Sequence, residues 1–328
     1  MSSASPTLTA ADPAPRLLDG DPATEAVTPA QRRARFFNSG NAFNLKLPAV
    51  PRARFDAARD AAMAGQATTG SYPMDQSAAI GCGFPATTPL VLARYLRVNP
   101  GETLATGFAA SGEVHYVIAG MGETKVGGTV AGEGGETIAW GPGDVMVLPG
   151  GMPVEHRALG GTAAVLWTVT NEPALAFERL SPPAPGAAAV DPVHYPAAEI
   201  ARQVEVLTSL PEAVGQAGVA LIFSAERTAD SRNAMPSLTL ALNTLAPGRH
   251  QRAHKHNAAA ITLCIDGEGC FSTIDGHRVE WSPFATMVTP PAEVHSHHNG
   301  GPRLARFLIV QDGGWHYHAR TMGFEFAE

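Results

Sequence analysis

The stretch PGRHQRAHKHNAAAITLCIDGEGCFSTIDGHRVEWSPFATMVTPPAEVHSHHN, residues 247–299, is the most informative part of this chain. It holds two histidines one residue apart, His254 and His256, and about forty residues later the run HSHHN, which begins at His295. Alternate residues of a strand point to the same face, so His254 and His256 would converge, and a turn-linked strand could bring His295 to meet them. Three neutral imidazoles on a rigid sheet, with coordination positions left open, predict a catalytic site for a divalent metal.

The alternative is that these histidines are structural, since a single histidine is more often a surface or hydrogen-bonded core residue than a ligand. Nine of the twelve histidines of the chain lie between His250 and His318, so composition alone does not explain them. A Pro-Gly turn precedes the pair, a Gly-x-Gly turn follows it, and a Pro-Pro turn precedes His295. This setting of short strands and turns favours the metal site.

The composition of the 328 residues agrees with short strands joined by many turns, because charged residues make up 16% and there are 34 glycines and 27 prolines. A net charge of −7 gives no electrostatic footprint for nucleic acid or for an anionic membrane, and we expect neither as a partner. No apolar run approaches the roughly 20 residues that span a bilayer, and no secretory signal is recognised. Three cysteines cannot form a disulfide framework, so a cytoplasmic protein is expected.

An internal repeat predicts two β-units of similar size. Pro100-Gly101 corresponds to Pro247-Gly248 at an offset of 147, and Trp140 corresponds to Trp281 at an offset of 141. The offset changes only once, through a longer hairpin around GGTVAGEGGE in the first copy. A duplicated small barrel or jelly roll is therefore expected.

Four segments follow from this organisation. They are an N-terminal arm with short helices (1–87), a first barrel (88–185), a linker with a helix (186–235) and a second barrel (236–328). In the arm we expect a helix that begins at Thr28-Pro29, with Thr28 as cap, and a second helix over 52–64. In the linker we expect a helix over 197–207.

The chain resembles the bicupin proteins, and in particular the gentisate 1,2-dioxygenase family, over roughly residues 85–328. The segments that carry the resemblance are HQRAHKHNAAA, HSHHN after Pro290-Pro291, PATTPLVLARYLRVNPGE and the ending QDGGWHYHARTMGFEFAE. The resemblance implies an all-β-dominated fold of two cupin barrels. It also implies Fe(II) bound by His254, His256 and His295, and cleavage of a hydroxylated aromatic acid with O2.

One feature of the metal ligands agrees with the gentisate-type pattern, and another departs from it. Cupins usually carry a glutamate a few residues after the histidine pair, and Ala260 stands at that place here, as in the three-histidine sites of the gentisate type. In the first copy the repeat puts Gly107, Ala109 and Val154 at the triad positions, whereas the family carries a histidine motif there too. The first barrel is therefore expected to have lost its metal ligands, with Glu113 alone at a cupin ligand position.

Residues beside the triad are candidates for catalysis. Arg252 lies two residues before His254 and would share its face if no bulge intervenes, so it could clamp a substrate carboxylate; an exterior salt bridge is the alternative. Arg306 is the next candidate for the clamp. His297 could act as a base or as a hydrogen-bond donor, or could be a plain polar residue at the barrel mouth.

The predicted function is an Fe(II)-dependent ring-cleaving dioxygenase that inserts O2 into a gentisate- or salicylate-like acid. One alternative keeps the cupin fold but uses Mn, Ni or Zn in an isomerase, hydrolase or lyase acting on a small acid. A non-enzymatic binding bicupin is the other alternative, although a pure scaffold needs no complete triad. The expected partners are a small aromatic acid, O2 and further copies of the chain in a homo-oligomer.

Overall fold

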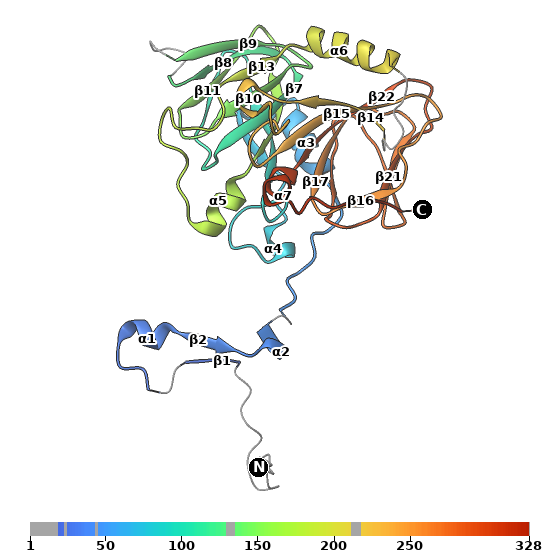
Figure 1. Cartoon of the computed structure of the whole chain (residues 1–328). Helices are drawn as coiled ribbons and strands as arrows, with labels where there is room; N and C mark the ends of the chain where they lie inside the picture. The colour runs from blue at the N-terminus through green and yellow to red at the C-terminus, as the bar shows by residue number, and fades with distance from the viewer. Residues whose placement is uncertain (1–18, 23–24, 43–44, 129–134, 211–217, 328) are drawn as a thin grey trace. The chain divides into compact units, whose positions relative to one another are not determined.

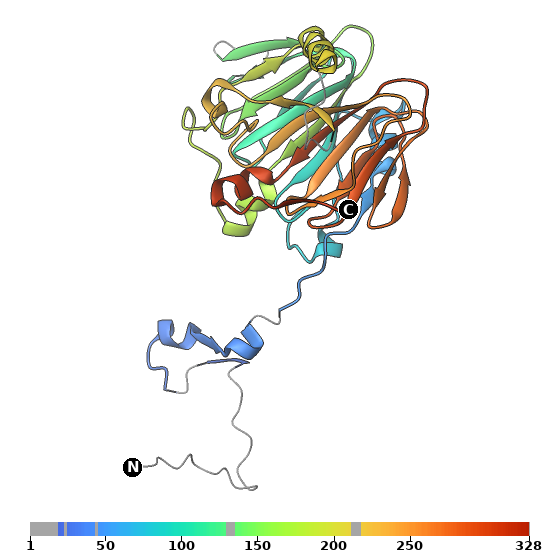
Figure 2. The same ribbon diagram turned by 45° about the vertical axis from the view of Figure 1, so that its right-hand side comes forward.

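The structure, a computed structural model, describes residues 19–22, 25–42, 45–128, 135–210 and 218–327. The unit Ala49–Glu328 consists of two β-barrels in tandem, which lie side by side in Figures 1 and 2. This agrees with the all-β-dominated tandem barrels predicted from the repeat. No helix among the described residues is long and apolar enough to cross a membrane.

The first barrel consists of a six-stranded and a four-stranded antiparallel sheet. The six-stranded sheet contains, in spatial order, β13 (Val193–Tyr195), β10 (Val145–Pro149), β7 (Gly112–Ala119), β12 (Ala164–Thr170), β5 (Leu92–Val98) and β4 (Gly70–Pro73). The four-stranded sheet contains β6 (Thr103–Thr106), β11 (Val154–Leu159), β8 (Met121–Val126) and β9 (Glu136–Trp140).

The second barrel consists of a six-stranded and a five-stranded sheet. The six-stranded sheet contains β14 (Val219–Phe223), β15 (Thr239–Leu245), β22 (Ala305–Gln311), β17 (Ala260–Asp266), β20 (Thr286–Thr289) and β3 (Ala53–Arg54). The five-stranded sheet contains β19 (His277–Glu280), β18 (Cys270–Ile274), β21 (His295–Asn299), β16 (His254–His256) and β23 (Phe324–Phe326).

The two six-stranded sheets share one hydrophobic core, which explains their long apolar runs. On β7, Val114, Tyr116 and Ile118 belong to this core, together with side chains of β15, β17 and β22 from the second barrel. The residues that alternate with these along each strand point into the interior of their own barrel, as Val117 does in the first and Cys264 in the second. Both faces of these strands are therefore buried, and every second side chain reaches the barrel interior.

A chain of three hydrogen-bonded side chains, from a tryptophan through a hydroxyl to a histidine, occurs in both barrels. Trp140 Nε1 donates to Thr124 Oγ1 (2.7 Å), which bonds His156 Nδ1 (2.7 Å). In the second barrel Trp281, Ser272 and His297 form the same chain, over 2.8 and 2.7 Å. A Cβ on Gly267 would come within 2.4 Å of the Trp281 ring, so glycine is required where this tryptophan packs. Trp281 itself packs in the hydrophobic core of the second barrel.

Short helices accompany the barrels, and two of the expected helices are confirmed. In the unit Met1–Pro48, α1 (Pro29–Arg33) begins after Thr28, whose side chain accepts from Gln31 N at 3.2 Å. The helix α6 (Ala197–Ser209) begins at the predicted residue and ends two residues later than expected. The remaining elements of the described residues are β1 (Asp19–Pro22), β2 (Arg35–Phe37), α2 (Ser39–Ala42), α3 (Asp56–Met63), α4 (Ser77–Ile80), α5 (Glu172–Glu178), η1 (Glu226–Thr228) and α7 (Gly313–Ala319).

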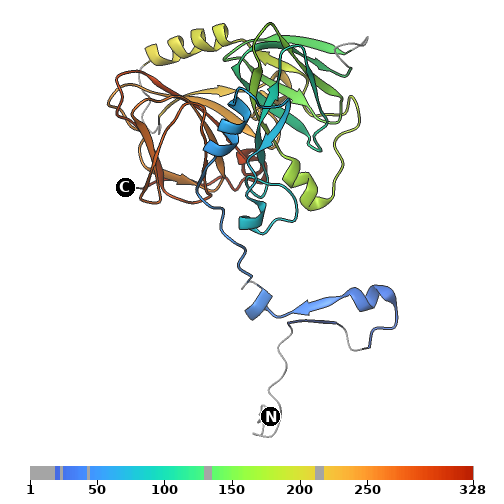
Figure 3. The ribbon, with the colours of Figure 1, turned by 180° about the vertical axis from the view of Figure 1, so that it is seen from behind.

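The helix expected over 52–64 is shorter in the structure. Residues 53–54 form β3, which pairs with β20 of the second barrel, and α3 begins only at Asp56. Figure 3 shows α3 against the back of the barrel pair, where the Ala62 carbonyl accepts from Arg97 of β5 at 2.8 Å. The first 18 residues of the expected N-terminal arm (1–87), and the tip of the longer hairpin of the first copy, lie outside the described residues. The four segment boundaries stay predictions.

Candidate metal centre

His254, His256 and His295 meet inside the second barrel. His254 and His256 occupy the two ends of β16, and His295 begins β21 directly opposite His254 in the antiparallel register. The ring centroids of His254 and His295 are 4.3 Å apart, and those of His256 and His295 are 4.7 Å apart. One ligating nitrogen from each ring lies within 4.8 Å of the other two, which suits three ligands of a single ion.

Backbone carbonyls fix the tautomer of all three rings. The Nδ1–H groups of His254, His256 and His295 donate to the carbonyls of Arg252 (2.7 Å), Ala258 (2.8 Å) and Glu293 (2.9 Å), respectively. Each Nε2 therefore keeps its lone pair, and each ring is held in the orientation that metal-binding histidines require.

Burial keeps the three imidazoles neutral. Loss of solvation lowers the pKa of His256 to about 4 and the pKa of His295 to about 3, and it also lowers the pKa of His254. Neutral imidazole is the form that binds a metal, so protons compete weakly for this site at neutral pH. The donor set fits a divalent transition ion, because imidazole suits Fe, Zn, Cu and Ni.

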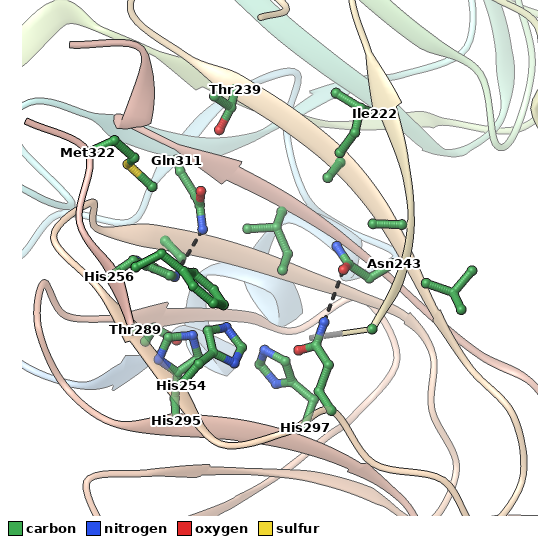
Figure 4. Close-up of a pocket in the computed structure, with 18 of the residues that line it drawn as sticks. Ile222, Thr239, Asn243, His254, His256, Thr289, His295, His297, Gln311 and Met322 are labelled. Carbon is green, nitrogen blue, oxygen red and sulfur yellow. Dashed lines mark hydrogen bonds between the residues drawn. The ribbon is translucent and has the colours of Figure 1, made fainter. Parts of the chain in front are cut away.

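A cavity of about 380 Å³ opens above the triad (Figure 4). Its wall comes from β14, β15, β17, β21 and β22, and from C-terminal residues that include Tyr317, Met322 and Phe324. Phe324 of β23 also stacks on His254, with ring centroids 5.1 Å apart. The described wall contains no arginine or lysine, so an anionic substrate would depend on the ion and on neutral hydrogen-bond donors.

His297 lies in the same cavity wall but has the opposite tautomer. Ser272 Oγ accepts from Trp281 Nε1, so its own hydrogen is directed to His297 Nδ1. Nε2 of His297 then carries the other hydrogen and is a donor at the cavity wall. Burial lowers the pKa of His297 well below its ordinary value, which keeps the ring neutral. Of the two roles considered for His297, this arrangement favours the donor over the base.

Arg252 does not line the described cavity. Its guanidinium lies 3.8 Å from the centroid of the Phe326 ring, beside a neighbouring depression that Arg249 and His250 also line. The strand β16 begins only at His254, so the alternation that would bring Arg252 to the triad face does not extend back to it. Arg306, the second candidate, forms a surface ion pair with Asp266 at 2.5 Å.

Three amide side chains line the cavity, and the sequence did not single them out. They are Asn243, Gln251 and Gln311. Gln251 Nε2 donates to Asn243 Oδ1 at 3.2 Å, while the buried Gln251 Oε1 has no hydrogen-bond partner among the described residues. Gln311 Nε2 lies 3.1 Å from His256 Nε2. Asn243 and Gln311 lie on β15 and β22, outside the histidine motif, and the register of the sheet brings them to the cavity.

The first barrel contains a different cluster at its centre. The three positions equivalent to the triad are Gly107, Ala109 and Val154, yet Glu113, His115 and His156 place their ligating atoms within 4.8 Å of one another. Their side chains are buried, and His115 already has both ring nitrogens engaged, by Glu113 (3.0 Å) and by Thr168 (2.8 Å). Burial raises the pKa of Glu113 to about 8 and lowers the pKa of His115 to about 3, which favours a neutral hydrogen-bonded pair.

Comparison with known proteins identifies a cupin domain over residues 241–311, which contains the triad. Among curated proteins the chain is similar to a 5-aminosalicylate 1,2-dioxygenase from Comamonas sp. (36% identical over 89 residues). It is also similar to a gentisate 1,2-dioxygenase from Ralstonia sp. (28% over 83 residues). These alignments cover 27% and 25% of this chain, and only 22% and 23% of the length of the relatives.

The fold as a whole is similar to that of a solved salicylate 1,2-dioxygenase from Pseudaminobacter salicylatoxidans. The TM-score is 0.69 at 15% identity, and the superposition covers 86% of this chain and 89% of the other. The same dioxygenase with gentisate bound gives a TM-score of 0.69 at 14% identity. These likenesses establish the tandem cupin fold.

Proposed function

We propose that the chain is an Fe(II)-dependent dioxygenase that cleaves the ring of a hydroxybenzoate-type acid, with the ion on His254, His256 and His295. The observation that carries the proposal is the set of three Nε2 lone pairs converging within 4.8 Å at the base of a cavity. The curated relatives are aromatic-ring dioxygenases, and their similarity supports the substrate class. Bound Fe(II) would supply coordination of the oxygens of the acid and activation of O2.

The residues of the chain would bind and orient the acid. The Nε2–H of His297 donates to a substrate oxygen such as the carboxylate, and Gln251 Oε1 accepts from a ring hydroxyl. Phe324 and Ile222 cover the cavity with apolar surface and limit the access of water. In this scheme Arg252 clamps the carboxylate only if its guanidinium leaves the Phe326 ring, and that role stays a prediction.

The first barrel serves as a structural partner. Its Glu113–His115 pair is buried and internally hydrogen-bonded, so a substrate has no access to it. The three cysteines are free thiols, which agrees with the reducing cytoplasmic location proposed for the chain. Assembly into a homo-oligomer also stays a prediction.

Oxygen uptake tests the proposal. The metal-free protein is loaded with Fe(II) and mixed with gentisate, salicylate or 5-aminosalicylate, and O2 consumption is followed together with loss of the aromatic absorbance. We expect consumption with at least one acid, and none in a His295→Ala variant. His298→Ala is the matched control, because His298 stacks on Phe271 and lies outside the cavity wall. No uptake with any acid by the iron-loaded wild type would favour an isomerase, hydrolase or lyase.

A further inference from the structure

The two barrels differ in a reciprocal way at one pair of facing residues. In the first barrel Glu113 of β7 lies opposite Thr170 of β12. The offsets of 147 and 141 that relate the two copies carry these positions to Ala260 and Gln311. These two face each other in the ladder between β17 and β22. Each barrel thus has one long polar side chain and one smaller one at this place. The long side chain is on β7 in the first barrel, but in the second barrel it is on β22, the strand that corresponds to β12.

Gln311 occupies the space that the small side chain of Ala260 leaves open. Its amide Nε2 lies 3.1 Å from Nε2 of His256 (Figure 4). The Nδ1–H of His256 donates to the Ala258 carbonyl, so its Nε2 carries a lone pair, and the amide N–H of Gln311 donates to that lone pair. Gln311 is therefore in contact with the nitrogen that the metal would take.

A cation on that lone pair would repel the amide N–H. A half-turn of the amide group exchanges its nitrogen and oxygen, and it brings Oε1 to the position now held by Nε2. Two ligand atoms about 2.1 Å from one ion, at a right angle, are about 3.0 Å apart. The 3.1 Å contact matches this separation, and amide carbonyl oxygens are established ligands of divalent cations.

We propose that Gln311 is the fourth protein ligand of the metal centre, through its side-chain oxygen. It replaces the carboxylate that the Glu113 position would supply, and it keeps the protein donor set neutral. A neutral amide binds a cation more weakly than a carboxylate does, so a substrate oxygen can displace it. The inference rests on the metal site proposed above but not on the reaction.

Metal titration of the metal-free protein with Mn(II) or Fe(II) tests the inference through the dissociation constant. Gln311→Thr should weaken binding about tenfold or more, in the range seen when groups around a metal are removed. The double variant Ala260→Glu/Gln311→Thr copies the first-barrel pair and should recover at least the wild-type affinity. Asn243→Ala removes another amide of the same cavity and should leave the affinity unchanged.

Wild-type affinity in Gln311→Thr would overturn the inference, as would equal losses in Gln311→Thr and Asn243→Ala. If Gln311→Thr does not fold, Gln311→Glu carries the test, because a carboxylate at this position should tighten binding about tenfold or more. Binding by Gln311→Glu that is no tighter than wild type contradicts the proposal. Intact metal binding without oxygen uptake would refute the reaction and leave the role of Gln311 standing.

Discussion

Glu113 of the first barrel should hold a proton at neutral pH, and Glu113→Gln tests this. The carboxyl is 2% exposed and lies 3.0 Å from Nε2 of His115, whose Nδ1 lies 2.8 Å from Thr168 Oγ1. A protonated carboxyl donates to Nε2 of His115 when the ring carries its own hydrogen on Nδ1. Burial raises the pKa of Glu113 to about 8 and lowers the pKa of His115 to about 3, so the folded pair holds one proton between these values.

The sign of the pH dependence follows from counting protons. The raised pKa of Glu113 stabilises the fold fully below its unfolded value of 4.5, and this contribution is lost as the pH rises to about 8. The lowered pKa of His115 stabilises the fold above 6.5, and this contribution is lost as the pH falls to about 3. The two slopes cancel between pH 4.5 and 6.5. From pH 6.5 to 8 only Glu113 contributes. Over this interval the contribution of the pair to the free energy of unfolding falls by about 2 kcal/mol, at 1.36 kcal/mol per pH unit.

Urea unfolding at pH 6.5 and pH 8.0, with a chelator present, measures this loss. Glu113→Gln keeps a hydrogen-bond donor towards His115 but cannot ionise, so its free energy of unfolding should change by about 2 kcal/mol less than that of wild type over the interval. Other titrating groups contribute equally to both proteins and cancel in the difference. Equal changes in the two proteins would refute the reasoning and would mean that Glu113 is already ionised in the fold.

Three further predictions concern the second barrel. Arg252→Lys should raise KM for the aromatic acid at unchanged metal content if the guanidinium clamps the carboxylate, and an unchanged KM would remove Arg252 from the site. Burial lowers the pKa of His256 to about 4 and the pKa of His295 to about 3, so the metal content measured after dialysis should stay constant from pH 7 to pH 5 and decrease below about pH 4. Loss of half of the metal near pH 6.5 would contradict the neutral triad. Ser272→Ala leaves the Trp281 N–H without its acceptor and frees His297 Nδ1, so the free energy of unfolding should fall by about 1–3 kcal/mol and KM should rise, whereas wild-type values of both would exclude this role.

The triad could be predicted from the sequence because a His-x-His pair needs only the alternation of a strand to converge. The Pro-Pro turn before His295 supplied the second requirement, since a strand that follows a turn could bring His295 back to the pair. Arg252 shows where this reasoning stops. The same alternation was extended two residues too far, because β16 begins at His254, and Gln251 lines the cavity instead.

The amides of the cavity and the first-barrel cluster depend on long-range register, which no local pattern encodes. Gln311 reaches His256 only because β22 pairs with both β15 and β17. His115 faces the interior of the first barrel because the odd-numbered residues of β7 point inward, and His156 meets it from the other sheet. A comparison of the two copies at the offset of 141 could have drawn attention to Thr170 and Gln311.

Metal content per chain tests the central claim most directly. Elemental analysis is made on wild type, on His254→Ala and on His298→Ala, each purified, stripped and reloaded with Fe(II) in the same way. We predict one ion per chain in wild type and in His298→Ala, and almost none in His254→Ala, because two remaining imidazoles bind weakly. Two ions per chain in wild type, or full metal content in His254→Ala, would contradict a single metal centre in the second barrel.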